Sequence, residues 1–108
     1  MSETIVLLYV TCKDVEEAKN IAGSLLRQKL AACVNIMPHM ESLYFWKGEL
    51  QSSKEVVLIV KTTQEKCDMC ADRIRALHSY ELPCVLPISA DGQKNPFAQW
   101  VRECVEDA

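Results

Sequence analysis

Hydrophobic and polar residues follow a regular pattern along the chain, and four of its segments are typical of β-strands. Residues 4–12 are β-branched and almost entirely apolar, and they are too few for a helix of this pattern, so we expect a strand buried on both faces. Residues 30–46 and 55–62 predict the two strands of a long β-hairpin that turns at Lys47-Gly48. Residues 83–89 predict a fourth, shorter strand.

Three other segments have the 3.6-residue period of amphipathic helices, and each follows a residue that caps helix N-termini. Asp14 begins the first helix, and Glu17 completes a capping-box pattern. Thr62 or Thr63 begins the second, and Asn95-Pro96 begins the third. The residues expected on the buried faces are Val15, Ala18, Ile21, Ala22, Leu25, Leu26 and Lys29, then Cys67, Cys70, Ala71, Ile74 and Leu77, and finally Phe97, Trp100, Val101, Cys104 and Val105.

Two shorter signals interrupt these elements. Pro38 cannot donate a hydrogen bond to a neighbouring strand, so we expect a bend, a bulge or a sheet edge there, with His39 in a surface loop. Asp91-Gly92 predicts a turn before the last helix.

The order of elements, β-α-β-β-α-β with a terminal helix, predicts an α+β chain with the ferredoxin-like split βαβ arrangement. This arrangement places the two main helices on one face of an antiparallel sheet. The strands at 4–12 and 55–62 are apolar on both faces, so the other face would leave a large apolar patch in water. We therefore expect a homo-oligomer in which copies cover this face, with a symmetry that the pattern does not fix.

Composition and charge narrow the class of protein. The 108 residues, 49% hydrophobic and 25% charged, fit one soluble globular domain over 1–108. The net charge of −3 and the lack of any Lys/Arg block disfavour a nucleic-acid partner. No apolar run is long enough for a membrane helix, and the first residues lack the basic region of a secretory signal, so we expect a cytoplasmic protein.

The densest candidate chemistry lies in residues 77–84, between the second helix and the fourth strand. His78, Glu81 and Cys84 fall within seven residues, and imidazole and thiolate ligands favour copper or zinc. These three residues are our candidate metal ligands. The alternative is an ordinary helix-to-strand connection whose polar groups face water, since a metal site needs three or four ligands in a set geometry.

Four blocks of the sequence together resemble one known family, in order and in spacing. They are Leu30-Ala31-Ala32-Cys33-Val34-Asn35, Ser42-Leu43-Tyr44-Phe45-Trp46-Lys47-Gly48, Glu55 with Lys61-Thr62, and His78-Ser79-Tyr80-Glu81-Leu82-Pro83. Over nearly the whole chain they resemble the CutA divalent-cation tolerance family. The resemblance implies a ferredoxin-like fold similar to the PII signalling proteins, a cytoplasmic homotrimer, and a role in tolerance of copper and other divalent cations.

The chain departs from the family at the candidate site. The family pattern is His-Pro-Tyr-Glu-Val-Pro-Glu, whereas Ser79 stands here in place of the proline and Cys84 in place of the final glutamate. Some bacterial members carry a cysteine near the end of the first strand that has been proposed as a metal ligand. Val10 occupies the matching position here, and Cys12 lies two residues further along the same strand face.

Functions other than divalent-cation tolerance have less support from the residues. A PII-like regulatory trimer would bind a small anionic ligand between subunits, with Lys47, Lys61 and Tyr80 as candidate contacts, although no Gly-rich phosphate loop is present. Cys67 and Cys70 form a C-x-x-C pair, but they are expected inside the second helix, where the helix dipole has weakened. No pattern of a known catalytic class is present, so we expect no enzymatic turnover.

Overall fold

The computed structural model describes residues 4–90 and 95–106, and its order of elements is the predicted one. The predicted turn at Asp91-Gly92 lies outside the described residues. The elements are β1 (Ile5–Cys12), α1 (Val15–Arg27), β2 (Cys33–Trp46), β3 (Glu49–Thr63), α2 (Gln64–Leu77), β4 (Val85–Ala90) and α3 (Pro96–Val105).

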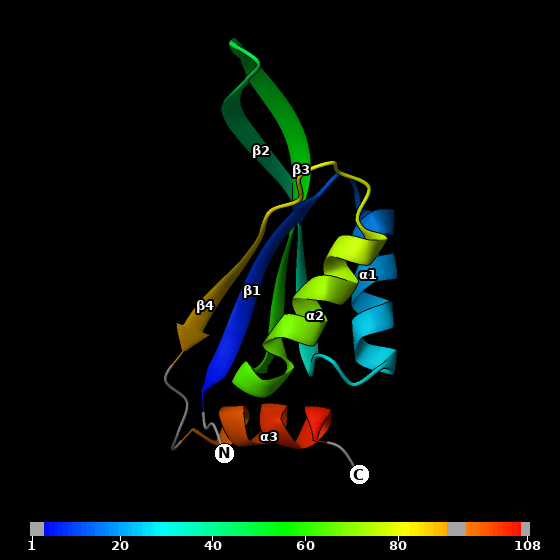
Figure 1. Ribbon diagram of the computed structural model, residues 1–108, viewed down its shortest axis with the longest axis vertical. Coiled ribbons are helices and arrows are strands. Elements are labelled where there is room, and N and C mark those ends of the chain that lie inside the picture. The colour runs from blue at the N-terminus through cyan, green and yellow to red at the C-terminus, as the bar shows by residue number, and fades with distance from the viewer. Residues whose placement is uncertain (1–3, 91–94, 107–108) are drawn as a thin grey trace.

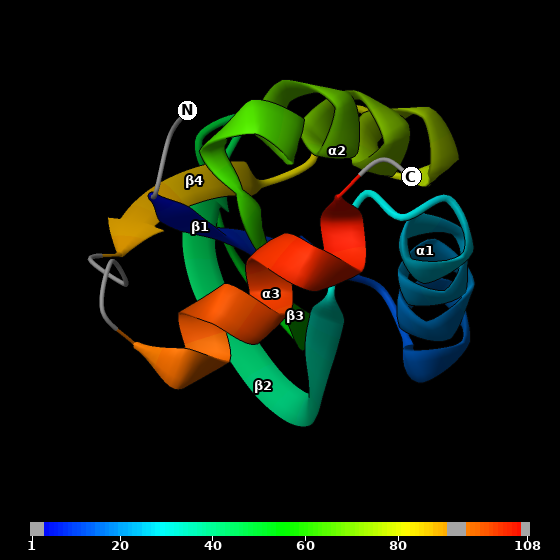
Figure 2. The same cartoon turned by 90° about the horizontal axis from the view of Figure 1, so that it is seen from below.

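The four strands form one antiparallel sheet in the order β2-β3-β1-β4, which confirms the ferredoxin-like arrangement. Helices α1 and α2 cover one face of this sheet, and α3 crosses its end away from the hairpin tip (Figures 1 and 2). Alternate residues of β1 point toward α1 and α2. They join one buried core with β3 and both helices, which includes Val6, Leu8, Val10, Cys12, Ile21, Leu25, Leu58, Val60, Cys70 and Ile74.

The helix starts follow the capping residues in the sequence. The Asp14 carboxylate accepts a 2.8 Å hydrogen bond from the Glu17 amide at the start of α1. Asn95 caps α3 in the same way, accepting from the amides of Phe97 and Ala98. Thr63 occupies the N-cap of α2, but its side chain makes no capping hydrogen bond, so this helix start depends on backbone geometry rather than on the predicted cap.

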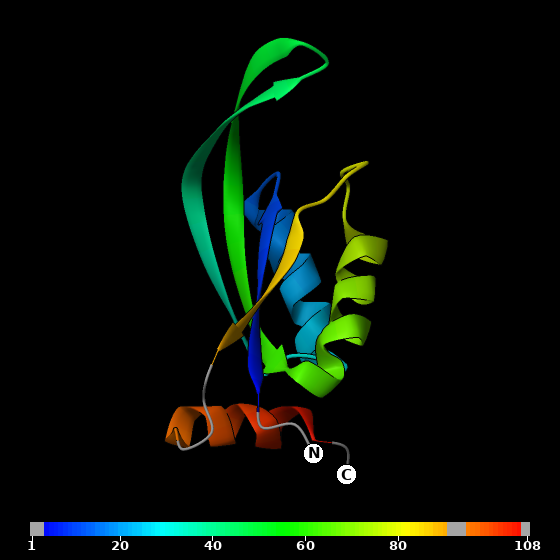
Figure 3. The same ribbon diagram turned by 60° about the vertical axis from the view of Figure 1, so that its left-hand side comes forward.

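Strands β2 and β3 form a hairpin that rises well beyond the rest of the molecule, which is 46 Å long (Figure 3). Lys47 and Gly48 at its turn both have positive φ, as a tight hairpin turn requires. A register shift between Met37 and Met40 confirms the irregularity expected at Pro38. The prediction that β3 starts at residue 55 was wrong, because the strand begins at Glu49 and pairs with β2 up to the turn.

The face of the sheet opposite α1 and α2 is apolar and open in the single chain. Leu86 and Ile88 of β4 are 57% and 52% exposed, and Leu7 and Tyr9 of β1 lie beside them in register. The hairpin carries further exposed apolar side chains. Trp46 lies on this face, whereas Leu43, Phe45 and Leu50 lie on the opposite face of the hairpin by register. The predicted uncovered face is therefore present, and the oligomer that would cover it stays a prediction.

The helix faces differ from the prediction at a few positions. Phe97 and Trp100 are 50% and 44% exposed, because α3 packs only Ala98, Val101 and Val105 inward. In α1, Leu26 is exposed although it was expected in the apolar stripe. The predicted face of α2 is buried at Cys67, Cys70, Ala71 and Ile74, while Leu77 is partly buried. Lys29 lies beyond the end of α1, with a positive φ.

Candidate functional site

The loop between α2 and β4 is held in place by His78, whose two ring nitrogens are both in hydrogen bonds. The Tyr80 amide donates to Nδ1 at 3.1 Å, and Nε2 lies 2.7 Å from the Thr11 carbonyl oxygen. Because Nδ1 accepts a hydrogen bond, it carries no hydrogen, and Nε2 carries the hydrogen that it donates to the Thr11 carbonyl. The imidazole is thereby fixed in one neutral tautomer, and a metal on either nitrogen would displace one of these bonds.

Glu17 holds the same loop from the start of α1. Its Oε2 accepts a 2.9 Å hydrogen bond from the Ser79 amide, and its Oε1 accepts from the Lys13 amide at 3.1 Å. Burial acts to raise the pKa of Glu17, but the hydrogen bonds from Ser79 and Lys13 outweigh it and the pKa lies below its usual value. The ionised carboxylate therefore ties the helix to the loop.

The loop also reaches β3 through a buried acid. The Tyr80 hydroxyl donates a 2.8 Å hydrogen bond to Oε2 of Glu55, whose side chain is only 9% exposed. Burial, and then the hydrogen bond to Glu55, raise the pKa of Tyr80 well above its usual value. Tyr80 is therefore a neutral donor to this carboxylate at any physiological pH.

A pocket of about 400 Å³ opens between this loop and the lower part of the hairpin. Its walls carry two carboxylates, Glu55 and Glu81, and three aromatic side chains, Tyr44, Trp46 and Tyr80. No Lys, Arg or His is among the described residues that line it. The pocket is therefore acidic and aromatic, and its chemistry favours a cation over an anion.

The structure brings two of the three predicted metal ligands to this pocket. Glu81 is exposed and Cys84 is half-buried, and both line the pocket, whereas His78 does not. Burial, and then the charge of Glu55, raise the pKa of Cys84. Across residues 4–90 and 95–106, no three His, Cys, Asp or Glu side chains are grouped to hold a metal ion. One chain therefore does not fit a complete metal site, and the predicted ligand set stays a prediction.

Three other cysteines, Cys12, Cys67 and Cys70, are poor nucleophiles in the fold. All six are free thiols. Burial raises the pKa of Cys12 to about 11, with the charge of Glu17 adding to the effect, and it raises the pKa of Cys70 to about 12. Burial, and then Asp68, also raise the pKa of Cys67. Since the thiolate is the reactive form, the C-x-x-C pair has the surroundings of core residues rather than of a redox site.

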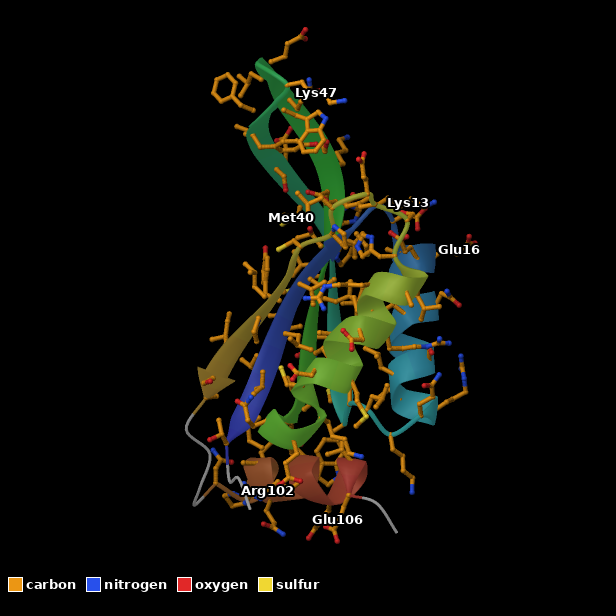
Figure 4. The ribbon with its side chains drawn as sticks, viewed as in Figure 1. Lys13, Glu16, Met40, Lys47, Arg102 and Glu106 are labelled. Carbon is orange, nitrogen blue, oxygen red and sulfur yellow. The ribbon has the colours of Figure 1, made fainter. Side chains whose placement is uncertain are left out.

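The three residues considered for an anion site do not form one cluster in the single chain. Lys47 is near the hairpin tip, with its ammonium 6.0 Å from the centre of the Trp46 ring (Figure 4). Lys61 lies near α3, where its ammonium is 5.1 Å from the Phe97 ring. Tyr80 lines the acidic pocket. One chain therefore places Lys47 beside Trp46, a wall of the pocket that Tyr80 lines, but leaves Lys61 at another part of the sheet.

Sequence reasoning missed the roles of Glu17 and Glu55. Glu17 was assigned only to a helix cap, and Glu55 entered only as part of a family block. A signal for Glu55 does exist, because it is a single acid at the start of the apolar run Val56–Val60. An acid beside an apolar run is buried unless the strand ends at that residue. A buried acid needs a hydrogen-bond donor or a positive charge as its partner.

No helix in the described part of the chain is both long and apolar enough to cross a membrane.

Comparisons with known proteins identify relatives over nearly the whole chain. Residues 6–104 match the family model described as CutA1 divalent ion tolerance protein. The chain is 41% identical to the divalent-cation tolerance protein CutA of Archaeoglobus fulgidus, over 92% of this chain and 96% of that protein. It is 36% identical to protein CutA of Homo sapiens over 91% of this chain, and it spans about half (55%) of the human protein.

Solved structures agree with the sequence matches. The crystal structure of CutA1 from Oryza sativa superposes with a TM-score of 0.91 at 34% identity, over 99% of this chain and 100% of that chain.

Proposed function

The chain belongs to the CutA1 divalent ion tolerance family, and from this we propose that it acts in divalent-cation tolerance as a homotrimer that takes up copper or a related cation without catalytic turnover. The family is named for tolerance of ions rather than for a reaction. The single observation that supports a cation as ligand is the acidic pocket, which has Glu55, Glu81 and Cys84 in its walls and no basic residue among the described lining residues.

The open sheet face supports assembly. Leu86 and Ile88 are more than half exposed, and the exposed apolar residues of the hairpin lie along β2 and β3, which belong to the same sheet. Covering such a surface with a second copy removes apolar area from water at about 25 cal/mol for each Å². Three copies around one axis are the arrangement that the family resemblance implies, and sheets that face each other would cover Leu86 and Ile88.

Glu81 and Cys84 are the predicted ligands that the fold leaves reachable. A carboxylate and a thiolate together suit Cu or Zn, and binding releases the thiol proton because the metal holds the deprotonated form. Water or a neighbouring copy supplies the remaining ligands. His78 acts instead to position the loop, since both of its nitrogens are in hydrogen bonds.

Native mass spectrometry of the reduced protein with and without Cu(II) and Zn(II) tests this proposal. We expect a trimer that takes up stoichiometric metal, loss of uptake in Cys84→Ser, and full uptake in the matched control Cys104→Ser on α3. A monomer, or a trimer that binds no metal specifically, would contradict the proposal. Loss of uptake in His78→Ala with the trimer intact would return the imidazole to the ligand set.

The alternative, a PII-like trimer that binds a small anion, gains no support from this pocket. Its two carboxylates repel an anion, and Lys61 lies near α3, away from the pocket. We also propose a cytoplasmic location, which the six free thiols support, because unpaired cysteines are typical of reducing compartments. Fractionation of cells that express the tagged chain tests this location.

A further inference from the structure

The pocket holds one buried carboxylate, Glu55, that is not among the residues proposed to ligate the metal. It is 9% exposed, and its hydrogen bond among the described residues comes from a neutral phenol, Tyr80. Carboxylates this deeply buried are ordinarily paired with a positive charge, because removing an ion from water is costly. Within the described part of the chain, no salt bridge involving Glu55 is present, and no basic side chain lines the pocket.

The walls around Glu55 suit a positive charge that carries carbon. Tyr44 and Trp46 come from β2, and Tyr80 comes from the loop after α2. Faces of aromatic rings attract cations, most strongly when the cation has left water. The ring of Trp46 already has an ammonium near it, since Nζ of Lys47 lies 6.0 Å from its centre.

The size of the pocket separates an organic ligand from a bare ion. A volume of about 400 Å³ falls in the range of small-molecule sites and far exceeds that of one metal ion. Leu82 adds an apolar wall, and Ser53 adds a hydroxyl. The pocket therefore offers carboxylates, aromatic ring faces and an apolar wall together. An inorganic cation would use only some of these contacts.

We propose that this pocket binds a small organic ammonium ion, with Glu55 and Glu81 neutralising its charge and Tyr44, Trp46 and Tyr80 enclosing its carbon atoms. The proposal goes beyond the tolerance function and does not depend on it. Residues 55 and 11 alternate with core residues of β3 and β1, so the pocket opens on the sheet face that other copies would cover. The assay therefore uses the intact oligomer.

Isothermal titration of the metal-free, reduced protein with choline and with 3,3-dimethyl-1-butanol tests the proposal. The second compound replaces the ammonium nitrogen with carbon and is otherwise of the same shape. We expect choline to bind at least about tenfold more tightly, because the ring faces and the carboxylates attract its charge and not the neutral compound. Equal affinity for the two compounds, or no binding of either, would overturn the proposal.

Two variants identify the groups responsible. Glu55→Gln keeps an oxygen that can accept the Tyr80 hydrogen bond but removes the charge, so choline affinity should fall about tenfold or more. Trp46→Leu removes a ring face without touching that bond and should also weaken choline binding. Glu16→Gln removes an exposed charge at the start of α1 and serves as the matched control, with unchanged affinity expected.

Other results separate this site from the metal and from a neighbouring subunit. Cys84→Ser should lose metal uptake but keep choline binding, so the two proposals fail independently. Unchanged choline affinity in both Glu55→Gln and Trp46→Leu would overturn the assignment to this pocket. Absence of choline binding together with dissociation of the Glu55→Gln oligomer would show that a basic side chain of another copy fills the pocket, which also overturns the proposal.

Discussion

The Tyr80 hydroxyl lies 2.8 Å from Oε2 of Glu55, and this bond joins the loop after α2 to the central strand β3. The two residues are 25 positions apart in sequence. The loop therefore owes part of its position to a buried acid on β3, in addition to the hydrogen bonds of His78 and Glu17.

Tyr80→Phe should lower the free energy of unfolding by about 1–3 kcal/mol, because it leaves the buried Glu55 carboxylate without its donor. Chemical denaturation at pH 7 measures this change. Tyr44→Phe is the matched control, since its hydroxyl bonds to Ser53 in an exposed position and its loss should cost under about 0.5 kcal/mol. Equal effects of the two substitutions would show that Glu55 does not need Tyr80.

Stability at acid pH should depend on Glu17. Its pKa is lower in the folded chain than in the unfolded chain, so the ionised carboxylate stabilises the fold above its ordinary pKa of 4.5. This contribution is lost as the pH falls through the folded pKa. Between pH 7 and pH 3, Glu17→Gln should therefore lose less stability than the parent protein, as measured by urea denaturation at each pH. Glu16→Gln, with an exposed acid on the same helix turn, should follow the parent.

The tautomer of His78 can be observed directly. Nitrogen-15 NMR at neutral pH should show a protonated Nε2 and an unprotonated Nδ1, since Nδ1 accepts from the Tyr80 amide and Nε2 donates to the Thr11 carbonyl. His39 is exposed on the hairpin and serves as the internal comparison, with averaged signals expected. A protonated Nδ1 at His78 would contradict the hydrogen-bond assignment.

Cys12 and Cys70 should resist alkylation in the folded protein at pH 8. Burial raises the pKa of Cys12 to about 11 and that of Cys70 to about 12, so almost no thiolate is present at this pH. Iodoacetamide labelling followed by mass spectrometry should find both residues unmodified until denaturant is added. Rapid labelling of Cys70, or a Cys67–Cys70 disulfide after mild oxidation, would support a redox role for the pair.

A charge on the open sheet face should disrupt assembly. Ile88→Lys places an ammonium on the apolar surface where Leu86 and Ile88 are exposed, and a charge is costly to bury against another copy. Sedimentation velocity should show a loss of the oligomer. Leu26→Lys on α1 adds the same charge to an exposed leucine away from the sheet and should leave the mass unchanged.

The sequence predicted the fold well because its signals are local. The caps at Asp14 and Asn95 can each be recognised from about four neighbouring residues. Both form the expected hydrogen bonds. The outer part of β3 was missed because residues 49–54 are mostly polar and have no strand pattern of their own. They become a strand only by pairing with β2, as in the partners Tyr44 and Gln51.

The site was less predictable, because its contacts join distant parts of the chain. His78, Glu81 and Cys84 were predicted as ligands because they lie close together in sequence, and that prediction stays untested. The partner of Ser79, Glu17, is 62 residues away, and no local pattern connects them. Phe97 and Trp100 fit a buried helical stripe by period, but a single chain offers nothing to cover them.

The bond between Ser79 and Glu17 has a consequence for how this chain can change over evolutionary time. The family pattern has proline at position 79, and proline has no amide hydrogen to donate. In a lineage that acquires proline at position 79, Glu17 keeps only its hydrogen bond from the Lys13 amide. Replacing Glu17 then costs only that bond. A lineage that keeps Ser79 makes the same replacement harmful. The order in which the two positions mutate therefore affects the stability of the intermediate, by the modest amount that one exposed hydrogen bond contributes.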